Sequence, residues 1–207
     1  MENIDAYKTI SKPSNEILFK EKKSKFFGYA FPINTEDEVR SIIESLRKKH
    51  HTANHFCYAW QLGETDPRYR VNDDGEPKNS AGAPIHGQIQ SFKVTNVLVV
   101  VIRIFGGTKL GIGGLIRAYR TAAQLALKQS TIIKRTIKDE IKIKFEYSEI
   151  DKVMGIIRQN QLKIISQDLE IDCIIVISSP KNKSEQVIDF FAPLNNVTIL
   201  KNEFPKH

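Results

Sequence analysis

The sequence predicts an α+β protein of two domains, and three observations support this expectation. Of its 207 residues, 41% are hydrophobic and 27% are charged, as in ordinary globular proteins. Segments with strand patterns and segments with helix patterns alternate along the chain. Residues 1–135 carry 21 Lys and Arg against 13 Asp and Glu, whereas residues 136–207 carry 10 against 11. We therefore expect one domain over residues 1–135 and a second over residues 136–207.

The first domain is expected to begin with extended structure and one helix. Residues 1–15 are polar and predict a loose arm or an edge. Aromatic residues that favour strands predict extended structure over residues 16–33. Thr35 is a candidate N-cap with Glu38 as its capping-box partner, and apolar residues at helical spacing continue to about Lys49.

A long loop and a buried strand dominate the rest of this domain. Residues 63–83 are rich in Gly, Pro, Asn and Asp and are expected to be largely loop, a length that is often functional. The apolar run within residues 95–105 predicts a strand buried on both faces. The other elements are expected at residues 55–62 (strand), 85–92 (short helix), 106–114 (glycine loop) and 115–130 (helix).

The second domain is expected to be ferredoxin-like, because its elements follow the order β-α-β-β-α-β. The expected elements are a strand at 137–147, a helix at 150–160, strands at 162–169 and 171–178, a helix at 183–192 and a strand at 196–201.

Several classes of protein are excluded by the sequence. The most apolar segment, residues 97–105, is interrupted by Arg103 and is shorter than the roughly 20 residues that span a bilayer. The N-terminus lacks a basic region followed by an apolar core, so no secretory signal is expected. Cys57 and Cys173 have neither disulfide-framework nor metal-site spacing. We expect a cytoplasmic protein without membrane segment, metal or cofactor; the sequence leaves its oligomeric state open.

Basic residues are concentrated in one acid-free segment. No Asp or Glu occurs between Glu76 and Asp139. A local excess of one charge attracts partners of the opposite charge, although an ordinary solvated surface has the same composition. The ten basic residues of this segment are Lys78, Lys93, Arg103, Lys109, Arg117, Arg120, Lys128, Lys134, Arg135 and Lys138.

Five of the nine residues from 106 to 114 are glycine. Glycine permits positive φ and close backbone approach, and a helix N-terminus presents amides to a phosphate. Lys109 is followed by Leu110, so the segment is not a P-loop, and no acidic residue follows as in a dinucleotide fingerprint. Either phosphate contact or tight turning and packing explains these glycines.

The helix expected after the glycine loop has a basic side. At 100° per residue, Arg117, Arg120, Gln124 and Lys128 fall within an arc of about 80°, opposite Leu115, Tyr119, Ala122 and Ala126. Together with Lys109 this side predicts a binding face. The residues expected to contact nucleic acid or phosphate are Arg103, Gly106, Gly107, Lys109, Gly111, Gly113, Gly114, Arg117, Arg120 and Lys128.

Three carboxylates, Asp73, Asp74 and Glu76, form an acidic loop. We favour pairing of this loop with Arg103, Arg117 or Arg120. Binding of a divalent cation, acid–base chemistry and a turn-rich loop without a site are the alternatives.

The sequence also contains the residue types of one nucleophile–base arrangement. His55, Cys57 and His86 are the residue types it needs, but the sequence places no orienting acid, and a buried core cysteine is the alternative. We therefore assign no catalytic residue.

Four ordered blocks of the sequence resemble the IMPACT/YigZ family. The blocks are SKFFGYAFPI, NHFCYAW, DDGEPKNSAGAPI and VVVIRIFGGTKLGIGGLIRAY. The resemblance implies an N-terminal domain with the fold of the second domain of small-subunit ribosomal protein five. It implies a ferredoxin-like C-terminal domain similar to the last domain of elongation factor G. Asn79 stands where the family commonly has glycine, and Ile104 where it has tyrosine, which weakens the case for a fixed catalytic geometry.

The resemblance also implies a role in translation. Eukaryotic relatives control translation by competing with activation of a kinase, through an additional RWD domain for which this chain leaves no room. The leading hypothesis is an RNA- or ribosome-binding protein that modulates translation, with Phe105 or Tyr119 stacking on a base if either is exposed. The alternatives are an enzyme acting on a small phosphorylated or nucleotide substrate between the two loops, and a protein-interaction module that binds a translation factor.

Overall fold

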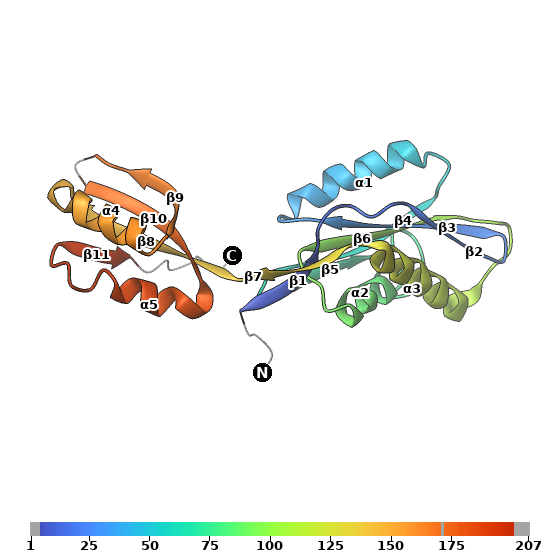
Figure 1. The fold of residues 1–207 in the computed structure, drawn as a ribbon. Helices are drawn as coiled ribbons and strands as arrows, with labels where there is room; N and C mark the ends of the chain where they lie inside the picture. Colours follow the sequence, from blue (N-terminus) through green and yellow to red (C-terminus); the bar gives the residue numbers. More distant parts are fainter. Residues whose placement is uncertain (1–4, 171, 201–207) are drawn as a thin grey trace. The chain divides into compact units, whose positions relative to one another are not determined.

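The computed structural model describes residues 5–170 and 172–200 and consists of two compact units (Figure 1). The larger unit spans Tyr7–Arg135. The smaller unit contains residues 5 and 6 and the described residues from Thr136 onward. No helix of the described chain is long and apolar enough to cross a membrane.

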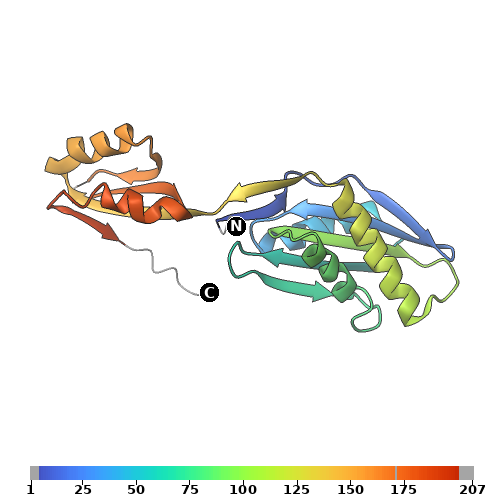
Figure 2. The ribbon, with the colours of Figure 1, turned by 60° about the horizontal axis from the view of Figure 1, so that its bottom comes forward.

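The larger unit is built on a five-stranded antiparallel sheet with the strand order β2-β3-β6-β4-β5. Helix α1 covers one face, and α2 and α3 lie side by side on the other (Figures 1 and 2). β1 and β7 form a separate two-stranded sheet. The strands are β1 (Ala6–Ile10), β2 (Ile17–Glu21), β3 (Ser24–Pro32), β4 (His55–Leu62), β5 (Arg68–Asn72), β6 (Val97–Ile104) and β7 (Ile132–Thr136). The helices are α1 (Asp37–Lys49), α2 (Gly82–Ser91) and α3 (Gly111–Gln129).

The central strand β6 supplies both halves of the core. Val97, Val99 and Val101 pack with α2 and α3, while the alternating residues Leu98, Val100 and Ile102 pack on the side of α1. All six side chains are fully buried, because successive residues of a strand point to opposite faces. The prediction of a strand buried on both faces is confirmed.

The structure differs from the sequence-based expectation at several elements. β7 was not expected, and α2 begins at Gly82 instead of residue 85. The segment expected to be loop contains β5, an edge strand whose exposed Arg68, Tyr69 and Arg70 carry no apolar alternation. Helix α3 begins at Gly111, four residues earlier than expected, so Gly113 and Gly114 are helical.

A further difference concerns the start of α1, which begins at Asp37. Thr35 does not cap it, although the Glu38 carboxylate accepts the amides of Asn34 and Thr35 as the predicted capping box requires.

The smaller unit has the predicted element order β-α-β-β-α-β. Its strands lie in the order β11-β8-β10-β9 with antiparallel neighbours. Alternate residues of β8 and β10 form a core with α4 and α5. Residues 171 and 201, expected at strand ends, lie outside the described chain. The elements are β8 (Lys138–Glu146), α4 (Ile150–Gln159), β9 (Lys163–Asp168), β10 (Asp172–Pro180), α5 (Ser184–Asp189) and β11 (Val197–Leu200), with single turns at Tyr147–Glu149 and Lys181–Lys183.

Candidate nucleic-acid interface

The first carboxylate of the acidic loop holds the N-terminus of α2. Asp73 Oδ1 accepts the amides of Ala81 and Gly82 at 3.0 and 2.8 Å, and Oδ2 accepts that of Asn79 at 2.8 Å. The first amides of a helix have no partner within the helix, and a carboxylate there also interacts favourably with the helix dipole. The Asp73 carboxylate therefore has a structural role, because both of its oxygens accept backbone amides.

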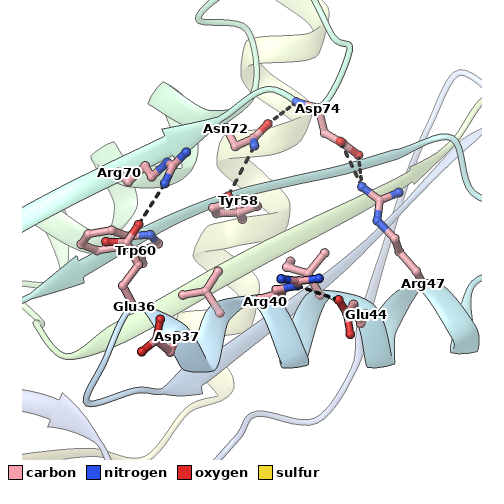
Figure 3. Close-up of a pocket in the computed structure, with 12 residues that line it drawn as sticks. Glu36, Asp37, Arg40, Glu44, Arg47, Tyr58, Trp60, Arg70, Asn72 and Asp74 are labelled. Carbon is pink, nitrogen blue, oxygen red and sulfur yellow. Dashed lines mark hydrogen bonds and ion pairs between the residues drawn. The ribbon is translucent and has the colours of Figure 1, made fainter.

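The second carboxylate ties the loop to α1. Asp74 pairs with Arg47 at 2.9 Å and accepts the amide of Phe56 at 2.7 Å. Figure 3 shows Arg47 reaching Asp74 from α1 across a groove beside β4 and β5. Asp74 and Gly75 have φ of 39° and 86°, so the chain turns sharply here, and glycine accommodates such a φ without strain.

The third carboxylate forms a buried ion pair. Glu76 Oε1 lies 2.7 Å from Arg103 Nη1 and also accepts the Tyr119 hydroxyl at 2.8 Å. The Arg103 and Glu76 side chains are only 7% and 4% exposed. Of the three arginines that the sequence offered as partners, the loop pairs with Arg103. Arg103 is thus positioned by the protein interior and is not presented to a phosphate.

These contacts also bear on metal and nucleophilic chemistry. Within the described residues, no group of three or more His, Cys, Asp or Glu side chains is arranged to hold a metal ion. Burial raises the pKa of the Cys57 thiol well above its usual value, and a thiol is a poor nucleophile when protonated. Cys57 lies against the Asp73 carbonyl and the Tyr119 hydroxyl, whereas His86 stacks on Tyr69 at 4.1 Å between ring centroids.

The glycines of the loop have different local reasons. A Cβ on Gly106 would lie 2.1 Å from backbone atoms of Lys23, so only glycine fits. Gly107 and Gly111 have φ of 85° and 70°, which favour glycine. A Cβ on Gly113 would meet nothing within 4 Å. Packing and turning therefore account for Gly106, Gly107 and Gly111, and phosphate contact by the loop stays a prediction.

The close approach at Gly106 reveals a basic cluster that the sequence reasoning missed. It brings the β2–β3 turn against the loop that carries Lys109, and both lie at one end of the sheet in Figures 1 and 2. All five side chains of this lysine cluster are exposed, and none forms an ion pair with a described residue. Its members are Lys20, Lys22, Lys23, Lys25 and Lys109. The sequence signal was the run KEKKSK at residues 20–25.

Helix α3 shows the predicted division into two sides. Its apolar side is buried, including Tyr119, which is 0% exposed. Arg117, Arg120 and Lys128 are exposed, and none of them pairs with a carboxylate in the described part of the chain. Gln124 is half-buried. The structure therefore leaves three unpaired cations on α3.

A groove of about 570 Å³ separates the acidic loop from the glycine loop. Phe105 and Ile112 line it and are 45% and 62% exposed. Arg103 lies in its wall, with its guanidinium 5.3 Å from the centre of the Phe105 ring. Arg103 Nε is the one buried side-chain polar atom of the described residues that lacks a hydrogen-bond partner. Lys109 also lines the groove.

The groove beside α1 in Figure 3 has a different electrostatic character. It measures about 620 Å³ and is lined by four carboxylates and three arginines. Each arginine is paired: Arg70 with Glu36 at 2.9 Å, Arg40 with Glu44 at 3.0 Å, and Arg47 with Asp74. Because each arginine is paired and the carboxylates outnumber the arginines, this groove has no excess of positive charge to attract a polyanion.

Comparison with known proteins places the sequence blocks in one family. Residues 22–127 match the model of the Impact N-terminal domain. The chain is 34% identical over 140 residues to "IMPACT family member YvyE" of Bacillus subtilis, which covers 68% of this chain and 64% of that protein. It is 32% identical over 175 residues to "IMPACT family member YigZ" of Escherichia coli, covering 84% of each. A solved structure of a hypothetical protein aligns with a TM-score of 0.77 at 27% identity, over 95% of this chain and 97% of that one.

Proposed function

We propose that this chain, which belongs to the IMPACT family as the four sequence blocks predicted, is an RNA- or ribosome-binding protein. Its proposed role is to modulate translation in the cytoplasm. The observation that carries the proposal is the unpaired positive charge of the larger unit. The lysine cluster and the exposed side of α3 present cations from segments that are distant in the sequence. Such a surface concentrates a polyanion and accelerates its encounter with the protein.

We propose the contacts as follows. Lys109, Arg117, Arg120, Lys128 and the lysines of the β2–β3 turn meet backbone phosphates, and the first amides of α3 add to them. Arg103 is left out, because it is buried against Glu76. The glycines at 106, 107 and 111 shape the loop that carries Lys109.

The proposed domain identities follow the same reasoning. We infer that the smaller unit is ferredoxin-like and similar to the last domain of elongation factor G, which its strand order and antiparallel neighbours support. We infer that the larger unit, residues 1–135 in the sequence-based division, has the fold of the second domain of small-subunit ribosomal protein five.

Salt dependence of RNA binding tests the function. Each phosphate contact contributes about −0.7 to −0.9 to the slope of log affinity against log salt. An Arg117→Glu, Arg120→Glu variant is expected to bind labelled RNA more weakly and with a shallower slope, measured by fluorescence anisotropy across roughly 50–300 mM salt. The matched control is Arg40→Glu, Lys48→Glu on α1, which lies on the opposite face of the sheet.

Two results contradict the proposal. One is an affinity that does not change with salt, and the other is an equal loss in the α3 and α1 variants. Sedimentation with ribosomes at low and moderate salt, with and without nuclease, extends the test to the assembled target. Association with a translation factor that persists after nuclease treatment would instead support the protein-interaction alternative.

The groove between the two loops is the observation that favours the enzyme alternative, since both Glu76 and Lys109 line it. Glu76 is, however, held by Arg103 and Tyr119, so it has no free role as a general base. Turnover of a nucleotide or sugar phosphate that is lost in Glu76→Gln but retained in Arg117→Glu, Arg120→Glu would favour the enzyme.

A further inference from the structure

We propose that the groove between the acidic and glycine loops receives an unstacked base of single-stranded RNA, which stacks on Phe105. The inference rests on the proposed function and specifies the form of RNA that the surface recognises. It assigns the sequence-based expectation of base stacking to Phe105, because the other candidate, Tyr119, is fully buried.

An exposed aromatic ring lies directly beside the unpaired cations. Phe105 follows the last residue of β6, and Lys109 lies four positions farther along the same loop. Proteins that bind single strands combine a basic surface for the backbone with aromatic rings on which bases stack. Phe105 is 45% exposed although it adjoins the core strand, and the proposed base gives that exposed ring a ligand.

The protein holds the Phe105 ring before any ligand arrives. The Arg103 guanidinium lies 5.3 Å from the centre of the Phe105 ring and 5.7 Å from that of Phe26. Glu76 fixes the same guanidinium at 2.7 Å. A ring that is already positioned loses less conformational freedom when a ligand binds. Arg103 is therefore a positioning residue for the stacking platform.

The groove has the size and the polar groups that a base requires. Its volume of about 570 Å³ lies within the range of roughly 300–1,000 Å³ for small-ligand sites. Asn54 and His55 line it and carry hydrogen-bonding side chains.

The charge of the groove favours a nucleic acid over an apolar peptide as its ligand. Glu76 is the carboxylate among its lining residues, and that carboxylate is 4% exposed and neutralised by Arg103. Lys109 is thus the exposed charge that the groove presents. A duplex keeps its bases paired and stacked, so their faces are not available to Phe105. The proposal therefore requires a preference for single strands.

The experiment compares the full chain and its variants on one labelled oligouridylate of about 12 nucleotides, a length within known site sizes, and on a duplex of equal length. Phe105→Ala is expected to lower the affinity for the single strand about 5- to 150-fold, the usual effect of losing one base–aromatic contact. Its salt slope stays unchanged, because no phosphate contact is removed. Phe105→Trp is expected to retain binding, and its new indole fluorescence to be quenched by the stacked base.

Two controls separate stacking from charge and from general exposure. Lys109→Gln is expected to make the slope shallower by about 0.7. Tyr69→Ala removes an aromatic side chain that is 59% exposed on β5, at the other edge of the sheet from the β2–β3 turn, and is expected to bind as the parent does. Circular dichroism and the melting temperature check that Phe105→Ala is folded. If it is not folded, fluorescence quenching in Phe105→Trp tests whether a base stacks at this position.

The outcomes distinguish the two proposals. Salt-dependent RNA binding that is unaffected by Phe105→Ala, or that is equally tight for duplex and single strand, overturns the base proposal and leaves the proposed function standing. An absence of quenching in Phe105→Trp at saturating RNA also overturns it. If the parent chain binds neither RNA nor ribosomes, the proposed function fails and this inference fails with it.

Discussion

Replacing Glu76 by glutamine tests the buried ion pair that links the acidic loop to β6. The substitution keeps the shape of the side chain and an acceptor for the Tyr119 hydroxyl, but it removes the charge that lies 2.7 Å from Arg103 Nη1. Both side chains are less than a tenth exposed, so the remaining guanidinium charge is buried without a counter-charge. Breaking such a pair costs about 3–5 kcal/mol of unfolding free energy, whereas an exposed pair contributes about 0–1 kcal/mol.

The single tryptophan makes the measurement specific to the larger unit. Trp60 lies in β4 and is 3% exposed, so its fluorescence reports unfolding of the sheet that contains the pair. With a urea m-value of about 2 kcal/mol/M, Glu76→Gln should lower the midpoint by about 1.5–2.5 M. The matched control is Glu44→Gln, which breaks an exposed pair with Arg40 and should change stability by about 0.5 kcal/mol or less.

A double variant separates the charge from the shape of the site. Arg103→Met, Glu76→Gln removes both charges, and replacing a whole buried pair by uncharged groups is often neutral or stabilising. We therefore expect the double variant to be more stable than Glu76→Gln alone. The reasoning is refuted if Glu76→Gln costs less than about 1 kcal/mol, or if the double variant is no more stable than the single one.

Two further predictions concern acid stability and the loop contact. Burial lowers the pKa of His86, and burial is also the main cause that lowers the pKa of His50; both therefore take up protons more readily in the unfolded state. The stability that the neutral histidines contribute is then fully present above the unfolded pKa of about 6.5 and falls as the pH drops towards the folded pKa values. The urea midpoint measured by Trp60 fluorescence should therefore decrease between about pH 7.5 and 5.5, and it should decrease less steeply in His86→Gln. A midpoint that does not depend on pH would contradict this prediction. Gly106→Ala should destabilise the larger unit by about 2 kcal/mol or more, because its Cβ would overlap the backbone of Lys23. Gly113→Ala, in open space on α3, should instead stabilise it by about 0.5–1 kcal/mol, and equal effects of the two substitutions would show that the contact at Gly106 is absent.

The elements that the sequence predicted are those whose pattern comes from burial. Residues 97–102 of β6 are all apolar and all fully buried, so their composition alone indicates a central strand. The two sides of α3 follow from the helical period. β5 was missed because an edge strand with exposed Arg68 and Arg70 has no buried residue to give an alternation. The start of α3 was missed because glycine is a poor helix former, yet Gly113 and Gly114 are helical.

The parts of the candidate site that the sequence did not predict depend on contacts between distant segments. Lys25 and Lys109 are 84 positions apart in the sequence. The segments that carry them meet in space because Gly106 approaches the backbone of Lys23 closely. The sequence also offered three arginines to the acidic loop without selecting one. Burial of Arg103 on β6 selects it, because a buried charge requires a partner, whereas Arg117 and Arg120 remain solvated on α3.

The acidic loop changes the meaning of the charge around it. In the sequence alone, its three carboxylates would be expected to repel a polyanion. In the structure, each carboxylate binds a partner within the protein: Asp73 binds amides of α2, Asp74 binds Arg47, and Glu76 binds Arg103. The charge neutralised inside the fold is that of Arg103, which then supports the ring of Phe105 from the groove wall. The exposed cations of the lysine cluster and α3 are left unpaired by described carboxylates. Loss of Glu76 should therefore weaken stacking on Phe105 while it leaves the salt slope unchanged, since the slope counts phosphate contacts.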